Sequence, residues 1–235
     1  MFAAAVQTTA PKIDIAGLAM CRGLARQAAS RIVAVSTLQK AKAGETLFSE
    51  GDDAEGIYEV VAGMLRLYKL LPDGRRQITG FISAGQILGL APEGTHVYSA
   101  EAINDVTLCR YPRVGFDRLI DEVPGLARRL LAVTSHELRA AQDQMLLLGR
   151  KAAGEKVASF LLLMADQQGS DDEVAVPMAR GDIADYLGLT TETVSRTFTK
   201  LRLEGLIGLP TPNHVEIRNR DQLEDFASGQ NDNDL

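Results

Sequence analysis

A short polar stretch in the last quarter of the chain carries side chains that can hydrogen-bond to nucleobases. It reads TTETVSRTFTK and covers residues 190–200. Arginine can donate two parallel hydrogen bonds to O6 and N7 of guanine, and glutamate can accept a hydrogen bond from the amino group of cytosine. Serine can form hydrogen bonds with several base edges. The residues predicted to read bases are Thr191, Glu192, Ser195 and Arg196. Glu192 and Arg196 also stand one i, i+4 step apart, so a solvated helix with an internal salt bridge is the alternative interpretation.

A helix-turn-helix is the element that would present this polar face. The first helix needs a small residue where the second one crosses it, and Ala184 stands there. The turn needs a residue that accepts a left-handed backbone, and Gly188 supplies it. Val194 is the inward apolar residue of the second helix, which Thr190 or Thr191 is predicted to cap. The other inward positions are filled by Ile183, Leu187, Leu189 and Leu201.

The segment after this motif has the pattern of a wing. Gly205 is expected to end the second helix, and two short strands are expected around residues 210–213. Basic and hydroxyl side chains near the motif are predicted to contact DNA phosphates, which fix the position of a protein on the duplex. These residues are Arg150, Lys151, Lys156, Arg180, Thr199 and Lys200.

The longest uninterrupted helical pattern lies in the middle of the chain, between Gly125 and Leu148. Such a helix would be roughly 36 Å long at ~1.5 Å per residue. Apolar or small residues recur there at alternating spacings of three and four, the a/d seam of a coiled coil. The seam consists of Leu131, Thr134, Leu138, Ala141, Met145 and Leu148. Because polar residues leave only this narrow stripe apolar, we favour a homodimer seam over a core helix packed on its own domain.

Short alternating segments separated by glycines occupy the first half of the chain, from about residue 36 to residue 120. Short strands at near-regular spacing with turn signals predict an all-β roll or barrel. The stretch from Leu71 to Gln77 is predicted to be a hairpin loop, since Asp-Gly tolerates the positive φ that such a turn needs. One helix is predicted before the roll, from Leu18 to Val35.

The bulk composition is ordinary for a soluble globular protein of 235 residues, with 46% hydrophobic and 24% charged residues. No apolar run approaches the ~20 residues that span a bilayer, and the N-terminus has no signal-peptide pattern, so a cytoplasmic protein without membrane contact is expected. The net charge of −6 argues against a nucleic-acid partner, and any DNA binding must rest on a local surface. No catalytic triad, phosphate loop or metal-ligand spacing stands out, so an enzyme is not expected.

The chain resembles the CRP/FNR family of bacterial transcription regulators, and within the FNR branch most of all the FixK group. The resemblance rests on YSAEAINDVTLCRYPR (98–113), on GEKVASFLLLMA (154–165) and on VPMARGDIADYLGLTTETVSRTFTKLRLEGLI (176–207). It implies an α+β protein with a cyclic-nucleotide-binding-like β-roll, a long dimerisation helix and a C-terminal winged helix-turn-helix. The expected divisions are an arm and helix (1–35), the roll (36–120), the dimerisation helix (121–149), the DNA-binding domain (150–228) and a disordered tail (229–235).

The family's recognition pattern falls on Glu192, Ser195 and Arg196. The cyclic-AMP-receptor branch carries Arg and Gly where this sequence has Thr191 and Ser195, so the resemblance implies TTGA-type rather than TGTGA-type half-sites. It further implies a homodimer on inverted repeats of double-stranded DNA with half-sites about one helical turn apart. RNA polymerase is the second expected partner, and the regulated genes are expected to serve low-oxygen respiration or nitrogen fixation.

The resemblance also implies where a signal would bind. The family's glutamate and arginine for cyclic nucleotide appear here as Leu90 and Tyr98, so no cyclic-nucleotide binding is expected. An iron–sulfur cluster needs four cysteines, and the chain has two. Cys109 is expected to be buried and Cys21 to be exposed, with a redox role for Cys21 as a hypothesis. A reactive cysteine of some FixK-group members corresponds here to Ala179, so that oxidation switch is not expected, and no cofactor is predicted.

Two alternatives to a DNA-binding activator without a ligand remain open. One is a CRP/FNR regulator whose roll senses a small molecule or haem, with His96 as a conceivable haem ligand. The other is a β-roll enzyme or cyclic-nucleotide-binding module whose winged helix serves protein contacts, which the acidic net charge favours.

Overall fold

The computed structural model describes residues 18–90 and 94–230 of the chain. It begins with a short 3₁₀ turn, η2 (Ala19–Cys21), and helix α1 (Arg26–Val35). The prediction of a single helix from Leu18 to Val35 is wrong. Gly23 adopts a left-handed backbone with φ of +79° and separates η2 from α1. The predicted N-terminal arm before residue 18 and most of the predicted disordered tail lie outside the described residues.

The roll consists of two four-stranded antiparallel sheets with strand orders β1-β8-β3-β6 and β2-β7-β4-β5. Their strands are β1 (Thr37–Ala41), β2 (Thr46–Phe48), β3 (Gly56–Ala62), β4 (Met64–Leu70), β5 (Arg76–Ser83), β6 (Ile87–Leu88), β7 (Ser99–Ala102) and β8 (Val106–Pro112). The predicted hairpin loop joins β4 to β5, and Gly74 in it has φ of +83°. Alternate residues of facing strands, including Val60, Leu65 and Leu108, fill the interior of the roll.

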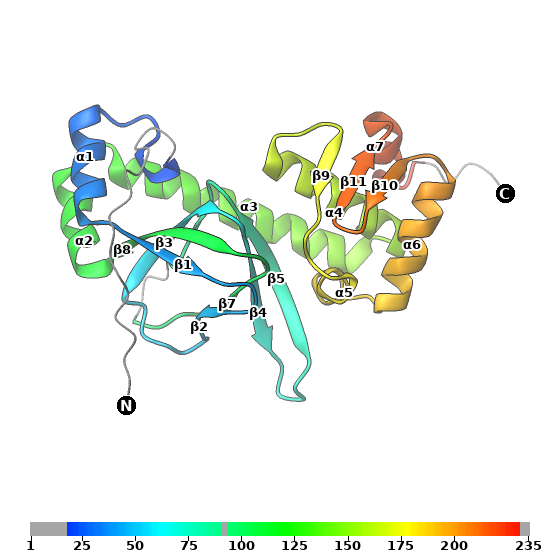
Figure 1. Ribbon diagram of the computed structural model, residues 1–235, viewed down its shortest axis with the longest axis horizontal. Coiled ribbons are helices and arrows are strands. Elements are labelled where there is room, and N and C mark those ends of the chain that lie inside the picture. The colour runs from blue at the N-terminus through cyan, green and yellow to red at the C-terminus, as the bar shows by residue number, and fades with distance from the viewer. Residues whose placement is uncertain (1–17, 91–93, 231–235) are drawn as a thin grey trace.

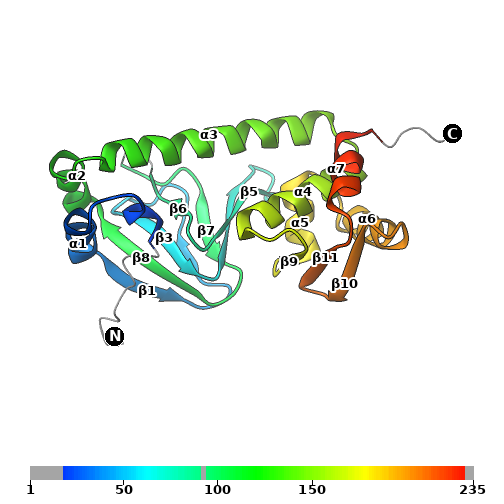
Figure 2. The ribbon, with the colours of Figure 1, turned by 90° about the horizontal axis from the view of Figure 1, so that it is seen from above.

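Two helices follow the roll, α2 (Arg113–Glu122) and α3 (Leu126–Arg150). Gly125, with φ of +89°, lets the chain turn between them. α3 has 25 residues, which corresponds to roughly 37 Å at ~1.5 Å per residue. Figure 2 shows that it runs along one side of both the roll and the C-terminal domain. The predicted helix from Gly125 to Leu148 is therefore confirmed to within two residues at its ends.

The C-terminal domain combines four helices with a small sheet. Its helices are α4 (Ala153–Gln168), α5 (Arg180–Leu187), α6 (Thr191–Leu203) and α7 (Arg220–Ser228), and its strands are β9 (Glu173–Ala175), β10 (Ile207–Thr211) and β11 (His214–Ile217). The two predicted wing strands are β10 and β11. The sequence did not predict β9, which pairs with β11, or α7, which packs beside α4.

The roll and the C-terminal domain share one hydrophobic core. Met64, Ile78 and Phe81 of the β4–β5 hairpin belong to the same buried cluster as the residues inside α4, α5 and α6. Figure 1 shows α5 beside β5, with α6 farther out on the side away from the roll. The two halves of the chain are thus packed against each other through α5, and α6 points outward.

Candidate nucleic-acid interface

The turn between α5 and α6 has the geometry that the sequence predicted. Gly188 ends α5 with φ of +62°, a backbone that an L side chain adopts at a cost. Thr190 is the N-cap of α6, since its Oγ1 accepts from the backbone N–H of Thr193 at 3.1 Å, which decides between the two predicted caps. Ala184 and Val194 are buried where the helices cross. Inward packing and capping therefore fix how α6 leaves the turn.

The opposite face of α6 is polar and open to solvent. The side chains of Glu192 and Arg196 are 71% and 79% exposed, and a guanidinium nitrogen lies 2.5 Å from a carboxylate oxygen. Ser195 and Thr191 are exposed on the same face. Ser195 Oγ donates to the carbonyl of Thr191 at 2.9 Å, which leaves its oxygen free to accept a bond from a base or phosphate. The structure thus brings the four predicted base-reading residues together on one exposed helix face.

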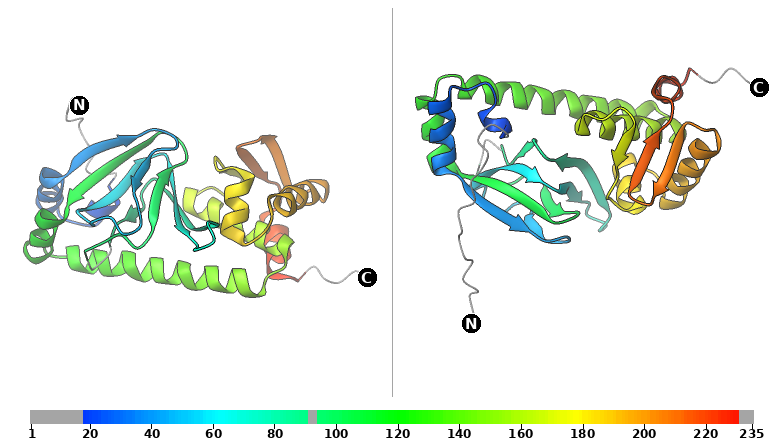
Figure 3. Two further views of the ribbon diagram at one scale, coloured as in Figure 1. Left: turned by 90° about the horizontal axis from the view of Figure 1, so that it is seen from below. Right: turned by 45° about the horizontal axis from the view of Figure 1, so that its top comes forward.

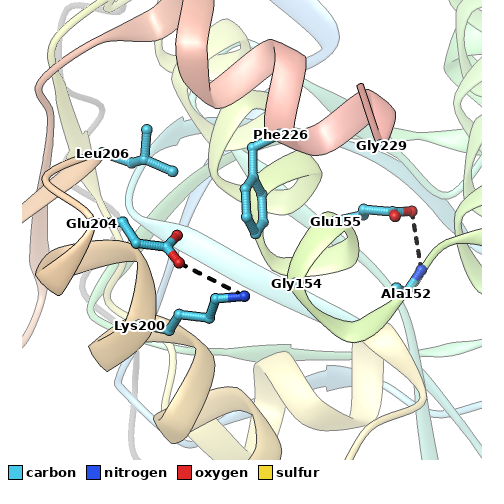
Figure 4. A pocket seen from close by; sticks show the side chains of 8 residues that line it. All are labelled: Ala152, Gly154, Glu155, Lys200, Glu204, Leu206, Phe226 and Gly229. Carbon is cyan, nitrogen blue, oxygen red and sulfur yellow. Dashed lines mark hydrogen bonds and ion pairs between the residues drawn. The ribbon is translucent and has the colours of Figure 1, made fainter. Parts of the chain in front are cut away.

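Arg180 and Lys200 border this face and each contacts an aromatic ring. The guanidinium of Arg180 lies 3.5 Å from the ring centroid of Phe198, and burial lowers the pKa of Arg180. Stacking uses the flat face of a guanidinium and leaves its in-plane N–H groups available. Lys200 lines a pocket together with Glu204 and Phe226 (Figure 4), and the volume of this pocket is about 460 Å³. The ammonium of Lys200 lies 3.7 Å from Glu204 and 5.6 Å from the ring centroid of Phe226. Thr199 and Arg150, the other predicted phosphate contacts, are exposed.

Two lysines predicted to contact phosphates are used inside the protein instead. Lys156 is buried, and its ammonium donates to the carbonyl of Leu187 at 3.3 Å, so the prediction of a phosphate contact there is wrong. Lys151 is half-buried and donates to Ser159 Oγ at 2.7 Å and to the carbonyl of Ala227 at 2.8 Å. The sequence alone does not show that residues of α5 and α7 contact these two lysines, so both were predicted to be accessible to DNA.

The predicted dimer seam is an exposed apolar stripe along α3. Leu131, Leu138 and Met145 are 67%, 61% and 66% exposed, and Leu148 is 37% exposed. Thr134 and Ala141 of the seam are exposed as well. No other described element covers this outer side of α3 (Figure 2 and Figure 3). Leu146 is 64% exposed too, but it lies outside the three-four spacing and therefore on another face of α3. Isolated exposed leucines are common, but a continuous row of them marks an association surface.

Comparison with known proteins agrees with this architecture. A model of the Crp-like helix-turn-helix domain matches residues 155–226, and a model of the cyclic nucleotide-binding domain matches residues 38–123. The nitrogen fixation regulation protein FixK of Bradyrhizobium diazoefficiens is 52% identical over 170 residues, which cover 71% of this chain and 72% of the relative. This chain belongs to the CRP/FNR family. Its members are DNA-binding transcription regulators, typically dimeric, and not enzymes.

Two further relatives place this CRP/FNR protein in the FNR branch. The transcriptional activatory protein AadR of Rhodopseudomonas palustris is 47% identical over 188 residues, 78% of each chain. The solved structure of FixK2 from Bradyrhizobium japonicum superimposes with a TM-score of 0.78 at 42% identity, and the match covers 82% of this chain and 97% of that one. The fold and the FixK-like resemblance predicted from the sequence are confirmed.

The two positions where the resemblance places the charges for a cyclic nucleotide carry an apolar side chain and a phenol in this chain. Leu90 and Tyr98 stand at the two expected charged positions, and the Tyr98 hydroxyl accepts from the backbone N–H of Gly89 at 3.3 Å. Burial raises the pKa of Tyr98, so its hydroxyl is neutral. The ring of Phe48 stacks on that of His96 with centroids 3.5 Å apart. A leucine and a neutral phenol cannot balance a phosphate or hold a ribose hydroxyl as a charge pair does, so these two residues do not supply that pair.

The two cysteines of this CRP/FNR protein do not fit an iron–sulfur cluster either, since a cluster is held by thiolates at the metal. Cys21 and Cys109 are both buried. The expectation that Cys21 is exposed is wrong, because η2 folds back onto the roll, where Glu59 accepts from the backbone N–H groups of Ala19 and Met20. Burial, then the charge of Glu59, raises the pKa of Cys21 to about 11. No sequence pattern predicted that Glu59 would be buried.

The described residues hold neither a metal-binding cluster nor a membrane-spanning helix. In residues 18–90 and 94–230, no three histidine, cysteine or acidic side chains gather as they would around a metal ion. None of the described helices combines the length and the apolar character needed to cross a bilayer.

Proposed function

We propose that two copies of this protein read TTGA-type inverted repeats of double-stranded DNA, with one α6 in each of two successive major grooves. The observation that carries the proposal is the exposed pair of Glu192 and Arg196 on the outer face of α6, flanked by Thr191 and Ser195. An arginine and a glutamate side by side can recognise neighbouring guanine and cytosine positions in the major groove.

The phosphate contacts of this complex come from residues around α6. Arg180, Thr199 and Lys200 border its reading face, and Arg150 lies at the end of α3. Each neutralised phosphate releases counterions, so affinity falls steeply with salt even though the protein as a whole is acidic. This local set replaces the larger one expected from the sequence, because Lys151 and Lys156 bind internal oxygen atoms.

The two copies associate along α3. The exposed stripe that includes Leu131, Leu138 and Met145 would be buried against the same stripe of the second copy, as in a two-stranded coiled coil. A two-fold axis along this seam presents two α6 helices related by symmetry, and such a dimer matches an inverted repeat with half-sites ~34 Å apart.

The biological role that fits best is transcription activation through contact with RNA polymerase, in the cytoplasm. The relatives named for nitrogen fixation regulation and for activation support low-oxygen respiration or nitrogen-fixation-linked genes as the targets. Leu90 and Tyr98 support regulation that does not use a cyclic nucleotide, so control is set by the amount of the protein rather than by a ligand in the roll.

Fluorescence anisotropy with three labelled duplexes tests the proposal. The first contains two inverted TTGA half-sites about one helical turn apart, the second contains TGTGA half-sites in the same places, and the third has a shuffled sequence. We expect binding to the TTGA duplex at least about tenfold tighter than to the TGTGA duplex, since each wrong base pair costs about 1–3 kcal/mol. Equal binding to all three duplexes at moderate salt would refute base reading by α6.

A further inference from the structure

The roll holds helix α5 through a group of charged side chains. Nη1 of Arg66 on β4 lies 3.0 Å from Oδ2 of Asp182, and Nη2 of Arg76 on β5 lies 2.5 Å from Oδ1 of the same carboxylate. Arg76 also donates from Nε and Nη2 to Oδ2 of Asp185 at 2.9 and 2.8 Å. The side chain of Asp182 is 6% exposed, so its ion pairs with Arg66 and Arg76 are screened less by water and salt than pairs on an open surface.

The carbonyl groups at the C-terminal end of α5 are each bound by a different neighbour. Gln77 Nε2 on β5 donates to the carbonyl of Asp185 at 2.6 Å. Gln144 Nε2 on α3 donates to the carbonyl of Tyr186 at 2.9 Å, and the ammonium of Lys156 on α4 donates to the carbonyl of Leu187 at 3.3 Å. The last carbonyls of a helix have no partner within that helix. Here the roll, the dimerisation helix and α4 satisfy three consecutive ones.

Aromatic rings close the same junction. The ring of Phe81 on β5 lies with its centroid 5.3 Å from that of Tyr186 on α5 and 5.9 Å from that of Phe160 on α4. All three rings are buried in the core shared by the two domains. Polar and apolar contacts therefore act together to fix α5 against the β4–β5 hairpin, and Gly188 connects this fixed helix directly to α6.

We infer that Arg66, Arg76 and Gln77 of the roll are positioning residues for DNA recognition. They contact α5 and set its orientation, and α5 sets the angle at which α6 leaves the turn. The docked arrangement leaves the reading face of α6 open, since Glu192 and Arg196 are 71% and 79% exposed. The contact therefore supports a binding-competent arrangement and does not mask α6. It provides an orientation of α6 that needs no ligand in the roll.

The test compares Arg76→Ala with Arg75→Ala in the full-length dimeric protein. Arg75 is the neighbouring residue, its side chain is 77% exposed, and its ion pair is with Asp73 in the same loop. Both variants lose one positive charge from the hairpin, but the Arg76 variant alone loses contacts to α5. For Arg76→Ala we expect affinity for the TTGA duplex about tenfold lower, in the usual range of coupling between sites. Affinity for the shuffled duplex and the salt dependence of binding should stay as in the wild type, because Arg76 contacts no phosphate.

Amide hydrogen exchange on the same proteins provides a readout without DNA. Exchange in α5 and in the first turn of α6 should be faster in Arg76→Ala and in Gln77→Ala than in the wild type, while Arg75→Ala leaves it unchanged. Arg76→Lys keeps a cation at the junction and should restore part of the affinity and of the protection. The DNA readout rests on the proposed function, whereas the exchange readout does not.

These outcomes separate the two hypotheses. A wild type that prefers no duplex would refute the proposed function, and the exchange data would still decide whether the roll holds α5. If the wild type prefers TTGA but Arg76→Ala behaves like Arg75→Ala in affinity and exchange, the inference is wrong. An Arg76→Ala variant that binds the TTGA duplex more tightly than the wild type would also overturn it, since the contact would then be inhibitory.

Discussion

Arg196 and Glu192 form an ion pair on the exposed face of α6, with a guanidinium nitrogen 2.5 Å from a carboxylate oxygen. An exposed pair of this spacing stabilises a helix by only about 0.3–0.5 kcal/mol. The two side chains are therefore only weakly tied to each other. A base edge that offers better partners can replace one contact without disturbing the fold.

The first prediction concerns Arg196 itself. Arg196→Ala should weaken binding to the TTGA duplex by ~1–3 kcal/mol per half-site and relax the preference at the guanine, because the bidentate contact is lost. Anisotropy on duplexes that vary this base measures the effect. Arg75→Ala is a matched control, since it removes the same type of side chain from an exposed loop of the roll, where Arg75 is 77% exposed and pairs with Asp73. An equal loss of affinity on every duplex would mark Arg196 as a phosphate contact instead.

The dimer seam gives a second prediction. Leu138→Glu should produce a monomer in analytical ultracentrifugation and abolish tight binding to the two-half-site duplex, because charges in an a/d seam repel each other across the interface. Leu138 is 61% exposed, so the fold of each copy should survive the substitution. His136→Glu places the same charge on an exposed part of α3 outside the seam and should remain dimeric. A dimeric Leu138→Glu protein would show that the copies associate elsewhere.

Lys156 allows a third test, because the structure assigns it an internal role. Lys156→Gln should lower the free energy of unfolding by about 1–3 kcal/mol, since the carbonyl of Leu187 loses its bond to a charged donor. The slope of DNA affinity against salt concentration should not change. Thermal melts and a salt titration measure the two quantities. A stable variant whose salt slope is reduced by about one phosphate contact would restore the phosphate role expected from the sequence.

The buried thiols lead to a fourth prediction. With the pKa of Cys21 raised to about 11, about one thiol in a thousand is ionised at pH 8, so native protein should react slowly with a thiol reagent. Both cysteines should react fast once a denaturant is added. The raised pKa means that the folded state holds this proton more tightly than the unfolded state does. The stability gained from it is complete below the ordinary pKa of 9.0 and is lost as the pH rises toward 11. Fast labelling of the native protein would contradict this assignment.

A fifth prediction concerns the roll. Calorimetry with cyclic AMP or cyclic GMP should detect no binding, because Leu90 and Tyr98 offer no charge to phosphate or ribose. The absorption spectrum of freshly purified protein should lack bands from haem or an iron–sulfur cluster. Micromolar affinity for either nucleotide, or a coloured protein, would favour the ligand-sensing alternative.

Much of the reading helix could be predicted from the sequence because its determinants are local. A small residue at Ala184, a glycine at Gly188 and an inward Val194 lie within one short segment, and the physical demands of a crossing between two helices fix their spacing. The stripe on α3 was predictable for the same reason, since a helix repeats its faces every three to four residues.

Features that depend on distant parts of the chain could not be predicted in this way. Arg76 and Asp185 stand 109 positions apart, and no periodicity connects them. Lys156 is buried because its ammonium binds the carbonyl of Leu187 at the end of α5. Cys21 is buried because Glu59 accepts a hydrogen bond from the backbone N–H of Met20, which stands 39 positions earlier in the chain. Charged side chains favour the surface in general, so those that fold inward are the ones that sequence patterns assign wrongly.

The most direct test of the account is selection of bound sequences from a pool of duplexes with a randomised central region, using the purified full-length protein. The account predicts enrichment of an inverted repeat of TTGA-type half-sites about one helical turn apart, protected on both strands in a footprint of the selected duplex. Enrichment of single half-sites, of TGTGA-type repeats, or of no sequence at all would contradict it.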